Sequence, residues 1–586
     1  MALLPSLSLI AAVLFLAVFG AGVFAWALCA AAVALAAAYL VLSWPRRASA
    51  HGSEGSSGIR GITVEQICAA ILVFLLLTLL SLPLSLTRLT GAGRYRQNVL
   101  VAEALQKAGS LGLVKDQPPV FAFSRNRAGT MRIAALAIAM IGAAMIAARL
   151  PPSAKTSYLH FLILLGAAIG AAGFVALRYI PQGDTLWWIQ PIPHGLPGPV
   201  ACFINRNHFA GLMAILSPVA LALAITGLAR RCWFNGVMAA LSFAVMSAAL
   251  IASLSRGAFI AYLAGILATP VFMVPPRRIL VGLCLGTLLC GALATTLVLR
   301  APSLRERMKT LQEPASNESL QDRLAAWRGS VRIWRAYPVA GAGANAFRMV
   351  YPQFRTDSAR GFRTHAENEY VQILAETGVI GVALCLLLGV AYLRSVLGPD
   401  YRPPENRILL MSAGGAAVAA AVHATNEFAL HAPLYAIVLS SVLGLPIWRK
   451  PPISGRVPRL ALLSLAAALA LCPAGLAMQR MDSASYLWRA DIGDLRRALL
   501  AAPTSRDAWY YLSRRITQAG GTQAGPFAEK CMSQAAAYDP NNYLLWLDLG
   551  NLRLKMNDDA GTRAAFRRVK ELRSWAEVPR VPEKAP

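Results

Sequence analysis

Four polar side chains stand in a short segment that leads into a long apolar run: His365, Asn368, Glu369 and Tyr370. On a helix, the first three would share one face, because residues three and four positions apart are neighbours on a helix surface. A histidine that a carboxylate orients can accept a proton from a hydroxyl near neutral pH. The pattern therefore offers a general base, although the start of a solvated helix is the commoner origin of such a triplet.

A second polar run precedes another apolar stretch and consists of Asn205, Arg206, Asn207 and His208. A helix that begins here would be capped by Asn205 or Asn207, and the free N–H groups of its first turn would favour an anion. The guanidinium of Arg206 would strengthen that preference. The alternative is an ordinary helix start whose arginine only reaches to the interface.

A third polar break consists of Arg256 and Gly257, which are predicted to form the whole connection between two apolar runs. A turn this tight holds the guanidinium at the membrane surface, where lipid-linked phosphates sit. An arginine that only anchors a helix would more usually face the cytoplasm. A fourth segment, from His423 to His431, places ionisable groups at the end of an apolar hairpin, where such groups are costly and are usually paired or functional.

The composition fixes the setting of these residues. Of the 586 residues, 56% are hydrophobic and 14% are charged, against roughly 25% charged in soluble domains. A water-soluble globule is excluded. Counting stretches of about 18–22 apolar residues predicts about thirteen membrane spans: 6–24, 26–44, 66–84, 131–149, 158–177, 209–229, 233–254, 257–274, 279–299, 371–395, 408–430, 432–448 and 459–479.

The net positive charge indicates which kinds of partner the protein could bind. Lys and Arg exceed Asp and Glu by 56 − 28 = 28, which suits either nucleic acid or an anionic membrane and substrate. The apolar composition favours the second, so we expect a lipid bilayer and no nucleic acid. The nine cysteines include no C-x-x-C pair and read as core residues. ATP-binding, metalloprotease, serine-hydrolase and D-x-D motifs do not occur, which counts against ATP-driven transport and metal-dependent sugar-nucleotide chemistry. No metal and no cofactor are expected.

Basic residues set the predicted orientation, because Lys and Arg concentrate in cytoplasmic connections. Six basic connections fall on one side of the thirteen-span topology, at 46–60, 149–155, 230–231, 277–278, 394–407 and 449–459. The amino terminus is then cytoplasmic. The long segments 85–130, 178–208 and 300–370 and everything after residue 480 lie outside, and the arginines they keep on this disfavoured side indicate an anionic ligand there.

The last hundred residues contain an internal near-repeat. Pro503 and Trp509 match Pro540 and Trp546 at an offset of 37 residues. This spacing resembles tetratricopeptide repeats, whose period is about 34 residues. The alternative is an amphipathic helical tail without repeat character. In both cases a small helical domain outside the membrane is expected, suited to docking a partner.

Together these segments resemble the O-antigen ligase and polymerase superfamily of bacterial membrane glycosyltransferases. The resemblance runs in order through residues 119–130, 203–212, 254–258, 327–347 and 365–381, and the last of these, H-A-E-N-E-Y-V-Q-I-L-A-E-T-G-V-I-G, is its most specific part. It implies metal-independent transfer of a glycan from an undecaprenyl-diphosphate carrier at the periplasmic face of the inner membrane. By motif, Arg206 and Arg256 would bind the donor diphosphate and His365 would activate the acceptor. Supporting roles would fall to Asn205, Asn207, His208, Asn368, Glu369, Tyr370 and Glu376.

The resemblance implies an all-α, GT-C-like polytopic bundle of about thirteen transmembrane helices with a small helical-repeat domain. The expected segments are membrane helices and a first periplasmic loop at 1–118, the catalytic membrane domain at 119–480 and a periplasmic tetratricopeptide-like domain at 481–586. The last could bind a polysaccharide-assembly partner.

The acceptor stays open, as a lipid A core, a growing glycan or a protein hydroxyl. A ligase, a surface-polysaccharide polymerase and a protein O-oligosaccharyltransferase are therefore all compatible with the sequence. A carrier or flippase for lipid-linked sugars is the competing class, and it would need no general base.

Overall fold

The fold is described by a computed structural model, which covers residues 4–18, 25–43, 63–82, 92–113, 121–179, 185–186, 190–191, 200–272, 318–355, 363–397, 407–447, 459–482, 487, 490–520, 524–579 and 581. In this part of the chain nearly all regular structure is helical, so the predicted all-α membrane bundle is confirmed. Among the residues that the structure describes, strands are limited to two short antiparallel pairs, β1 (Ser81–Leu82) with β2 (Phe121–Ala122) and β3 (Thr185–Leu186) with β4 (Gln190–Pro191).

Apolar helices coincide with twelve of the thirteen predicted spans, and the thirteenth, 279–299, lies outside the described residues. Five of them are long and apolar enough to cross a membrane unaided: α6 (Arg127–Ala148), α7 (Pro152–Tyr179), α8 (Arg206–Ala229), α9 (Trp233–Ala252) and α15 (Glu369–Leu397). The shorter ones are α1 (Leu4–Val18), α2 (Ala25–Ser43), α3 (Val64–Leu77), α10 (Arg256–Ala268), α16 (Arg407–His423), α17 (Pro433–Gly444) and the apolar part of α18 (Arg459–Asp482).

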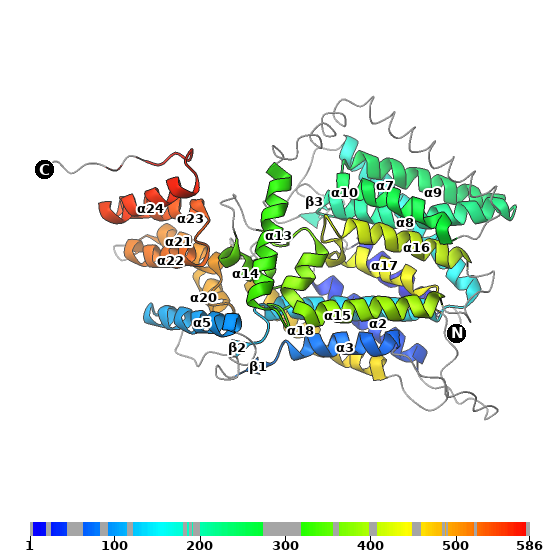
Figure 1. Ribbon diagram of the computed structural model, residues 1–586, viewed down its shortest axis with the longest axis horizontal. Coiled ribbons are helices and arrows are strands. Elements are labelled where there is room, and N and C mark those ends of the chain that lie inside the picture. The colour runs from blue at the N-terminus through cyan, green and yellow to red at the C-terminus, as the bar shows by residue number, and fades with distance from the viewer. Residues whose placement is uncertain are drawn as a thin grey trace.

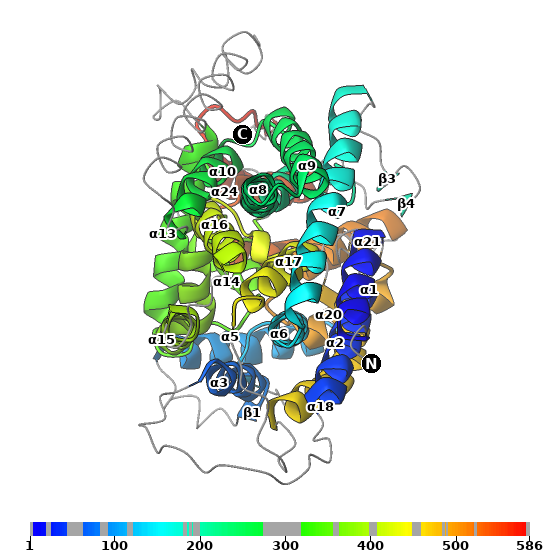
Figure 2. The same cartoon turned by 90° about the vertical axis from the view of Figure 1, so that its right-hand side faces the viewer.

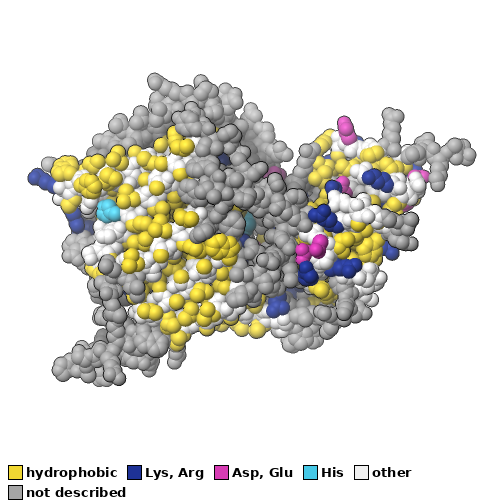
Figure 3. Space-filling model, turned by 180° about the vertical axis from the view of Figure 1, so that it is seen from behind, with side chains coloured by type: hydrophobic (Ala, Val, Ile, Leu, Met, Phe, Trp, Pro, Cys, Tyr) yellow, Lys and Arg dark blue, Asp and Glu magenta, His cyan; other side chains and the backbone are white. Residues whose placement is uncertain are grey.

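The bundle and the carboxy-terminal helices form two lobes. In Figure 1 the helices of the bundle run across the picture and the tail stands at one end of them, with α13 (Glu318–Ala336) and α14 (Phe347–Phe354) in between. Figure 2 looks along the bundle and shows α8, α16 and α17 in its interior. Figure 3 shows hydrophobic side chains spread over the bundle, whereas charged side chains gather on the other lobe. This distribution is expected for a membrane-embedded part and a part exposed to water.

The tail consists of α20 (Ile492–Ala501), α21 (Arg506–Ala519), α22 (Ala524–Tyr538), α23 (Tyr543–Lys555) and α24 (Asp559–Leu572). The near-repeat recurs in its contacts. The indole N–H of Trp509 donates to the carbonyl of Pro503 at 2.8 Å, and that of Trp546 donates to Pro540 at 2.9 Å. The resemblance of these hairpins to tetratricopeptide repeats stays a prediction.

A helix from the first long connection joins the tail. Ala104 and Ala108 of α5 (Ala92–Ser110) are fully buried in the same hydrophobic core as Trp509 and Leu512. The sequence placed α5 with the amino-terminal segment, and nothing in its pattern indicated this packing. The tail core therefore draws on two parts of the chain about 400 residues apart.

The longest helix of the bundle, α15, is broken at Gly378, whose backbone has φ 60° and ψ −162°. The segment between α13 and α14 fills the break. The N–H groups of Ala342 and Gly343 donate to the carbonyls of Ala375 and Glu376, and the N–H of Val379 donates to Pro338. This segment satisfies backbone groups that the break would otherwise leave without partners.

A methyl group at Gly378 would be misplaced in two ways. The positive φ is strained for any residue with a Cβ, and an added Cβ would lie 2.5 Å from the carbonyl of Val339. We expect Gly378→Ala to lower the free energy of unfolding by at least about 1–3 kcal/mol, measured as thermal unfolding of the purified protein in detergent. Gly389→Ala, in the same helix with nothing within 4 Å, is the matched control and should be neutral. Equal stability of the two variants would contradict this account of the break.

Candidate functional site

One end of the bundle gathers the polar residues that the sequence analysis identified. Here α6, α8, α10 and α15 begin and α16 ends, and a connection with the short 3-10 helix η5 (Ala429–His431) leads into α17. We call this the polar end. Several helices thus present their amino termini on the same side, where unpaired N–H groups and the helix dipoles favour negative charge.

Arg206 and Arg256 are each the first residue of a helix at the polar end. The prediction that Asn205 or Asn207 caps α8 is resolved in favour of Asn205, whose Oδ1 accepts the N–H of Asn207 at 2.8 Å. The side chain of Arg206 is exposed and that of Arg256 is half-buried.

The prediction that Arg256 and Gly257 form the connection between two spans was wrong. The connection consists of residues 253–255, with Leu254 at φ 56°, and Arg256 and Gly257 already belong to α10. The turn is therefore one residue longer than expected and lies earlier in the chain. An added Cβ on Gly257 would lie 3.2 Å from Cβ of Asn426, so the start of α10 packs on the connection between α16 and α17.

The buried carboxylate of Glu427 joins three elements at the polar end. It accepts a hydrogen bond from Nδ2 of Asn207 on α8 and lies 3.2 Å from Nη2 of Arg323 on α13. Its other oxygen lies 3.8 Å from Nε2 of His208. Burial raises the pKa of Glu427 to about 7, although the charge of Arg323 opposes the shift.

His365 does not lie on a helix with Asn368 and Glu369, and this prediction was wrong. Helix α15 begins at Glu369, and Asn368 caps it, with Oδ1 accepting the N–H groups of Tyr370 at 3.0 Å and Val371 at 3.2 Å. The cap requires a non-helical backbone, so His365 stands in the segment before the helix. Its Nδ1 lies 2.9 Å from Oγ1 of Thr364.

The aromatic surroundings of His365 come from the connection between α16 and α17. Its ring stacks on Phe428, with centroids 3.9 Å apart and planes 7° apart, and lies 4.8 Å from the ring of His431. Burial lowers the pKa of His365 well below the ordinary imidazole range, and the charges of His431, His208 and Arg132 lower it further. His365 is therefore a neutral imidazole at physiological pH.

Glu369 orients a different histidine from the one expected. Its Oε1 lies 3.5 Å from Nδ1 of His431 and accepts the N–H of Leu430 at 3.0 Å. Burial alone would lower the pKa of His431, but the carboxylates of Glu369 and Glu376 outweigh it and raise the pKa. The polar end thus holds a neutral His365 beside a His431 that carries positive charge more readily.

The other predicted residues make supporting contacts. The hydroxyl of Tyr370 donates to the carbonyl of Ala421 at 2.9 Å, and Nδ2 of Asn368 donates to Thr425 at 2.9 Å, so both tie α15 to the end of α16. The carboxylate of Glu376 accepts the N–H groups of Asn345 and Phe347 at 2.7 and 3.0 Å.

Two residues of the site, Arg132 and Glu427, were not predicted as site residues from the sequence. Arg132 lies in the first turns of α6, inside an apolar run, and its charge acts on both His365 and His431. A lone arginine inside a predicted span is the signal that could have found it. Glu427 was visible only as a member of the segment His423 to His431. Among the described residues, no group of three His, Cys, Asp or Glu side chains could hold a metal ion.

The polar end offers two chemical capabilities. Arginines and helix amino termini can bind an anion with several oxygens, and a neutral imidazole a few ångströms from a second histidine can accept a proton.

Part of the chain matches the model of a known family. Residues 241–386 match the family model described as O-antigen ligase, and this range includes Arg256, Arg323, His365 and Glu376. No curated protein matches the chain. The matched domain, together with the all-α membrane bundle around it, supports the resemblance of the chain to the O-antigen ligase and polymerase superfamily of membrane glycosyltransferases.

Proposed function

We propose that the protein transfers a glycan from an undecaprenyl-diphosphate carrier to an acceptor hydroxyl at the periplasmic face of the inner membrane. One observation carries the proposal: Arg206 and Arg256 begin two helices at the same end of the bundle as the pair of His365 and His431. A diphosphate-binding group and a proton acceptor are the two functions that this reaction needs.

The donor diphosphate is the leaving group, and its charge must be stabilised as the glycosidic bond breaks. Arg206 and Arg256 supply guanidinium groups that bind phosphate oxygens in a bidentate manner and stay charged at every physiological pH. The first-turn N–H groups of α8 and α10 add to this field. Two arginines in these positions can neutralise the diphosphate without a metal ion.

The acceptor hydroxyl must lose its proton as the new bond forms. We assign this step to His365, because its lowered pKa keeps it unprotonated and its ring is fixed between Thr364 and Phe428. The proton passes from the acceptor oxygen to a ring nitrogen of His365, while the electron pair of that oxygen forms the bond to the anomeric carbon. His208, which has the carboxylate of Glu427 beside it, is the rival base.

The acceptor class is a separate question, and the ligase, polymerase and protein-glycosylating alternatives share the same donor chemistry. Within the superfamily we favour a surface-polysaccharide polymerase or related enzyme, because the chain adds a helical tail to the membrane domain. The tail offers a surface for a polysaccharide-assembly partner.

The first prediction concerns donor binding. Arg206→Lys and Arg256→Lys should each lower the rate of glycan transfer about 10²–10³-fold, because an ammonium group cannot replace the bidentate guanidinium. The rate is measured with purified protein and a lipid-linked donor. Arg230→Lys is the matched control, since this exposed arginine caps the opposite end of α8, and it should keep full activity. Lysine variants as active as this control would leave the two arginines only an anchoring role.

The second prediction concerns the base. His365→Ala should lower transfer by about 10²–10⁴-fold while donor binding persists, and His160→Ala near the opposite end of the bundle is the control. Because the pKa of His365 is depressed, the native enzyme should stay active as pH falls through 6.5 and lose activity only well below it. The residual activity of His365→Ala should lack this acid limb.

An acid limb that persists in His365→Ala would refute the assignment. An inflection near pH 7 in both proteins would point instead to Glu427, whose pKa is raised to about 7.

The third prediction concerns orientation. Reporter fusions after Arg278 and Arg402 should report the cytoplasm, and fusions at Asn317 and Asn541 should report the periplasm, because the basic connections lie on one side of the predicted topology. A cytoplasmic signal at Asn541 would place the tail and the polar end away from the outer leaflet and contradict the proposed reaction.

A further inference from the structure

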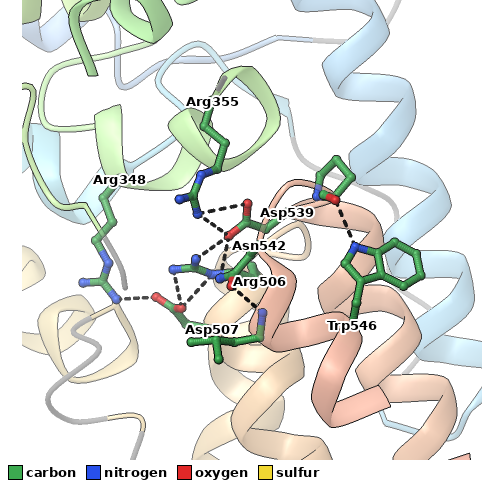
Figure 4. A network of polar contacts seen from close by, with 9 residues as sticks. Arg348, Arg355, Arg506, Asp507, Asp539, Asn542 and Trp546 are labelled. Carbon is green, nitrogen blue, oxygen red and sulfur yellow. Dashed lines mark hydrogen bonds and ion pairs between the residues drawn. The ribbon is translucent and has the colours of Figure 1, made fainter. Parts of the chain in front are cut away.

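The tail is attached to the bundle by ion pairs that are shut off from water (Figure 4). Nη1 of Arg355, directly after α14, lies 3.3 Å from Oδ2 of Asp539, and the two side chains are 2% and 0% exposed. The same carboxylate lies 2.6 Å from Nη1 of Arg506 in the tail. In addition, Nδ2 of Asn541 donates to the backbone carbonyl of Arg355 at 2.8 Å.

A second pair lies one helix length away on α14. Nη2 of Arg348 lies 2.8 Å from Oδ2 of Asp507, and Nη2 of Arg506 lies 2.8 Å from Oδ1 of the same carboxylate. Burial alone would raise the pKa of Asp507, but the two arginines outweigh it and lower the pKa. Asp507 and Asp539 are therefore each shared between an arginine of the tail and an arginine at α14.

Such contacts are unlike those of a loosely tethered module. A buried ion pair is expensive to desolvate, and losing one partner leaves an uncompensated charge, so the pair strongly favours one docked arrangement over all others. Helix α5 adds a third contact, because Nε2 of Gln97 donates to Oε1 of Gln353 at 2.5 Å while the far half of α5 packs in the tail core.

The first residue of α14, next to Arg348, is bound to the site. The carboxylate of Glu376 accepts the N–H of Phe347, the first residue of α14. Nε2 of Gln372 donates to the same carboxylate at 3.3 Å, and Oε1 of Gln372 accepts the N–H of Ala366 at 3.0 Å. Ala366 is the neighbour of His365, so direct contacts lead from the tail acids through α14 to the proposed base.

We propose that Arg348 and Arg355 are positioning residues for glycan transfer: through them the docked tail fixes α14, and α14 fixes Glu376, Gln372 and the backbone beside His365. The inference rests on the proposed function in naming His365 as the base. A helix of eight residues is too short to be stable alone, so α14 takes its position from what holds its two ends.

The test uses the full-length protein with Arg348→Met and Arg355→Met combined. The pairs of Arg506 with Asp507 and Asp539 remain, so the tail keeps its internal network. We expect kcat to fall about 10-fold or more, because an ångström of misplacement is costly in a catalytic site, while KM for the lipid-linked donor changes by less than about 2-fold. Amide hydrogen exchange of residues 364–372 should become faster while α21 to α23 stay protected.

Two further variants separate positioning from general stability. Arg553→Met removes an ion pair with Glu529 inside the tail, 2.7 Å long and not at the junction, and should leave kcat and the exchange of residues 364–372 unchanged. The variant with lysine at both 348 and 355 keeps the charges and should recover most of the lost kcat.

The outcomes also distinguish this inference from the proposed function. A double methionine variant with normal kcat and normal exchange at residues 364–372 would overturn the inference. Absence of transfer in the wild-type protein would overturn the proposed function instead, and the exchange measurement would still decide whether the tail fixes the segment beside His365.

Discussion

The rest of the polar end depends on the break in α15 and on the hydrogen bonds that fill it, including those of the Glu376 carboxylate. A helix that changes direction inside a bundle exposes N–H and carbonyl groups that the membrane cannot hydrate. Here the segment that joins α13 to α14 enters the break and supplies their partners, and Glu376 binds the amide groups of Asn345 and Phe347 in return. The close approach of the two backbones at Gly341 and Gly378 is possible only because neither residue has a side chain.

The charges at the polar end follow from a second constraint, that carboxylates in a poorly hydrated region need partners. Glu427 uses Asn207 and Arg323, and Glu369 uses His431 and a backbone amide. The acids are thus occupied with holding α8, α13, α15 and α17 together. Arginines and helix amino termini stand beside these acids, and their positive charge suits the anionic donor proposed above.

The apolar spans, a cap at Asn205 or Asn207 and the presence of a short turn near Arg256 could be predicted, because each depends on residues close together in the sequence, although the exact residues of the turn could not. The partner of Glu369 could not, since His431 is 62 positions away and approaches only after α16 and α17 fold back. The helical face shared by His365, Asn368 and Glu369 failed for a local reason: the amide of Asn368 caps α15 and ends the helix before it reaches His365. The pairing of Arg355 with Asp539 spans 184 residues and leaves no periodic signal.

The shared carboxylates of Asp507 and Asp539 also link the internal stability of the tail to its docking. Asp507 and Asp539 each bind an arginine of the tail and an arginine at α14, so the charges that stabilise the tail hairpins are the same ones that dock it. Undocking would remove Arg348 and Arg355 and leave two acids to Arg506 alone, in a site built for more positive charge. The same two carboxylates therefore serve the tail hairpins and the docking of the tail, and a partner that binds the docked tail must use surfaces other than the one that holds α14.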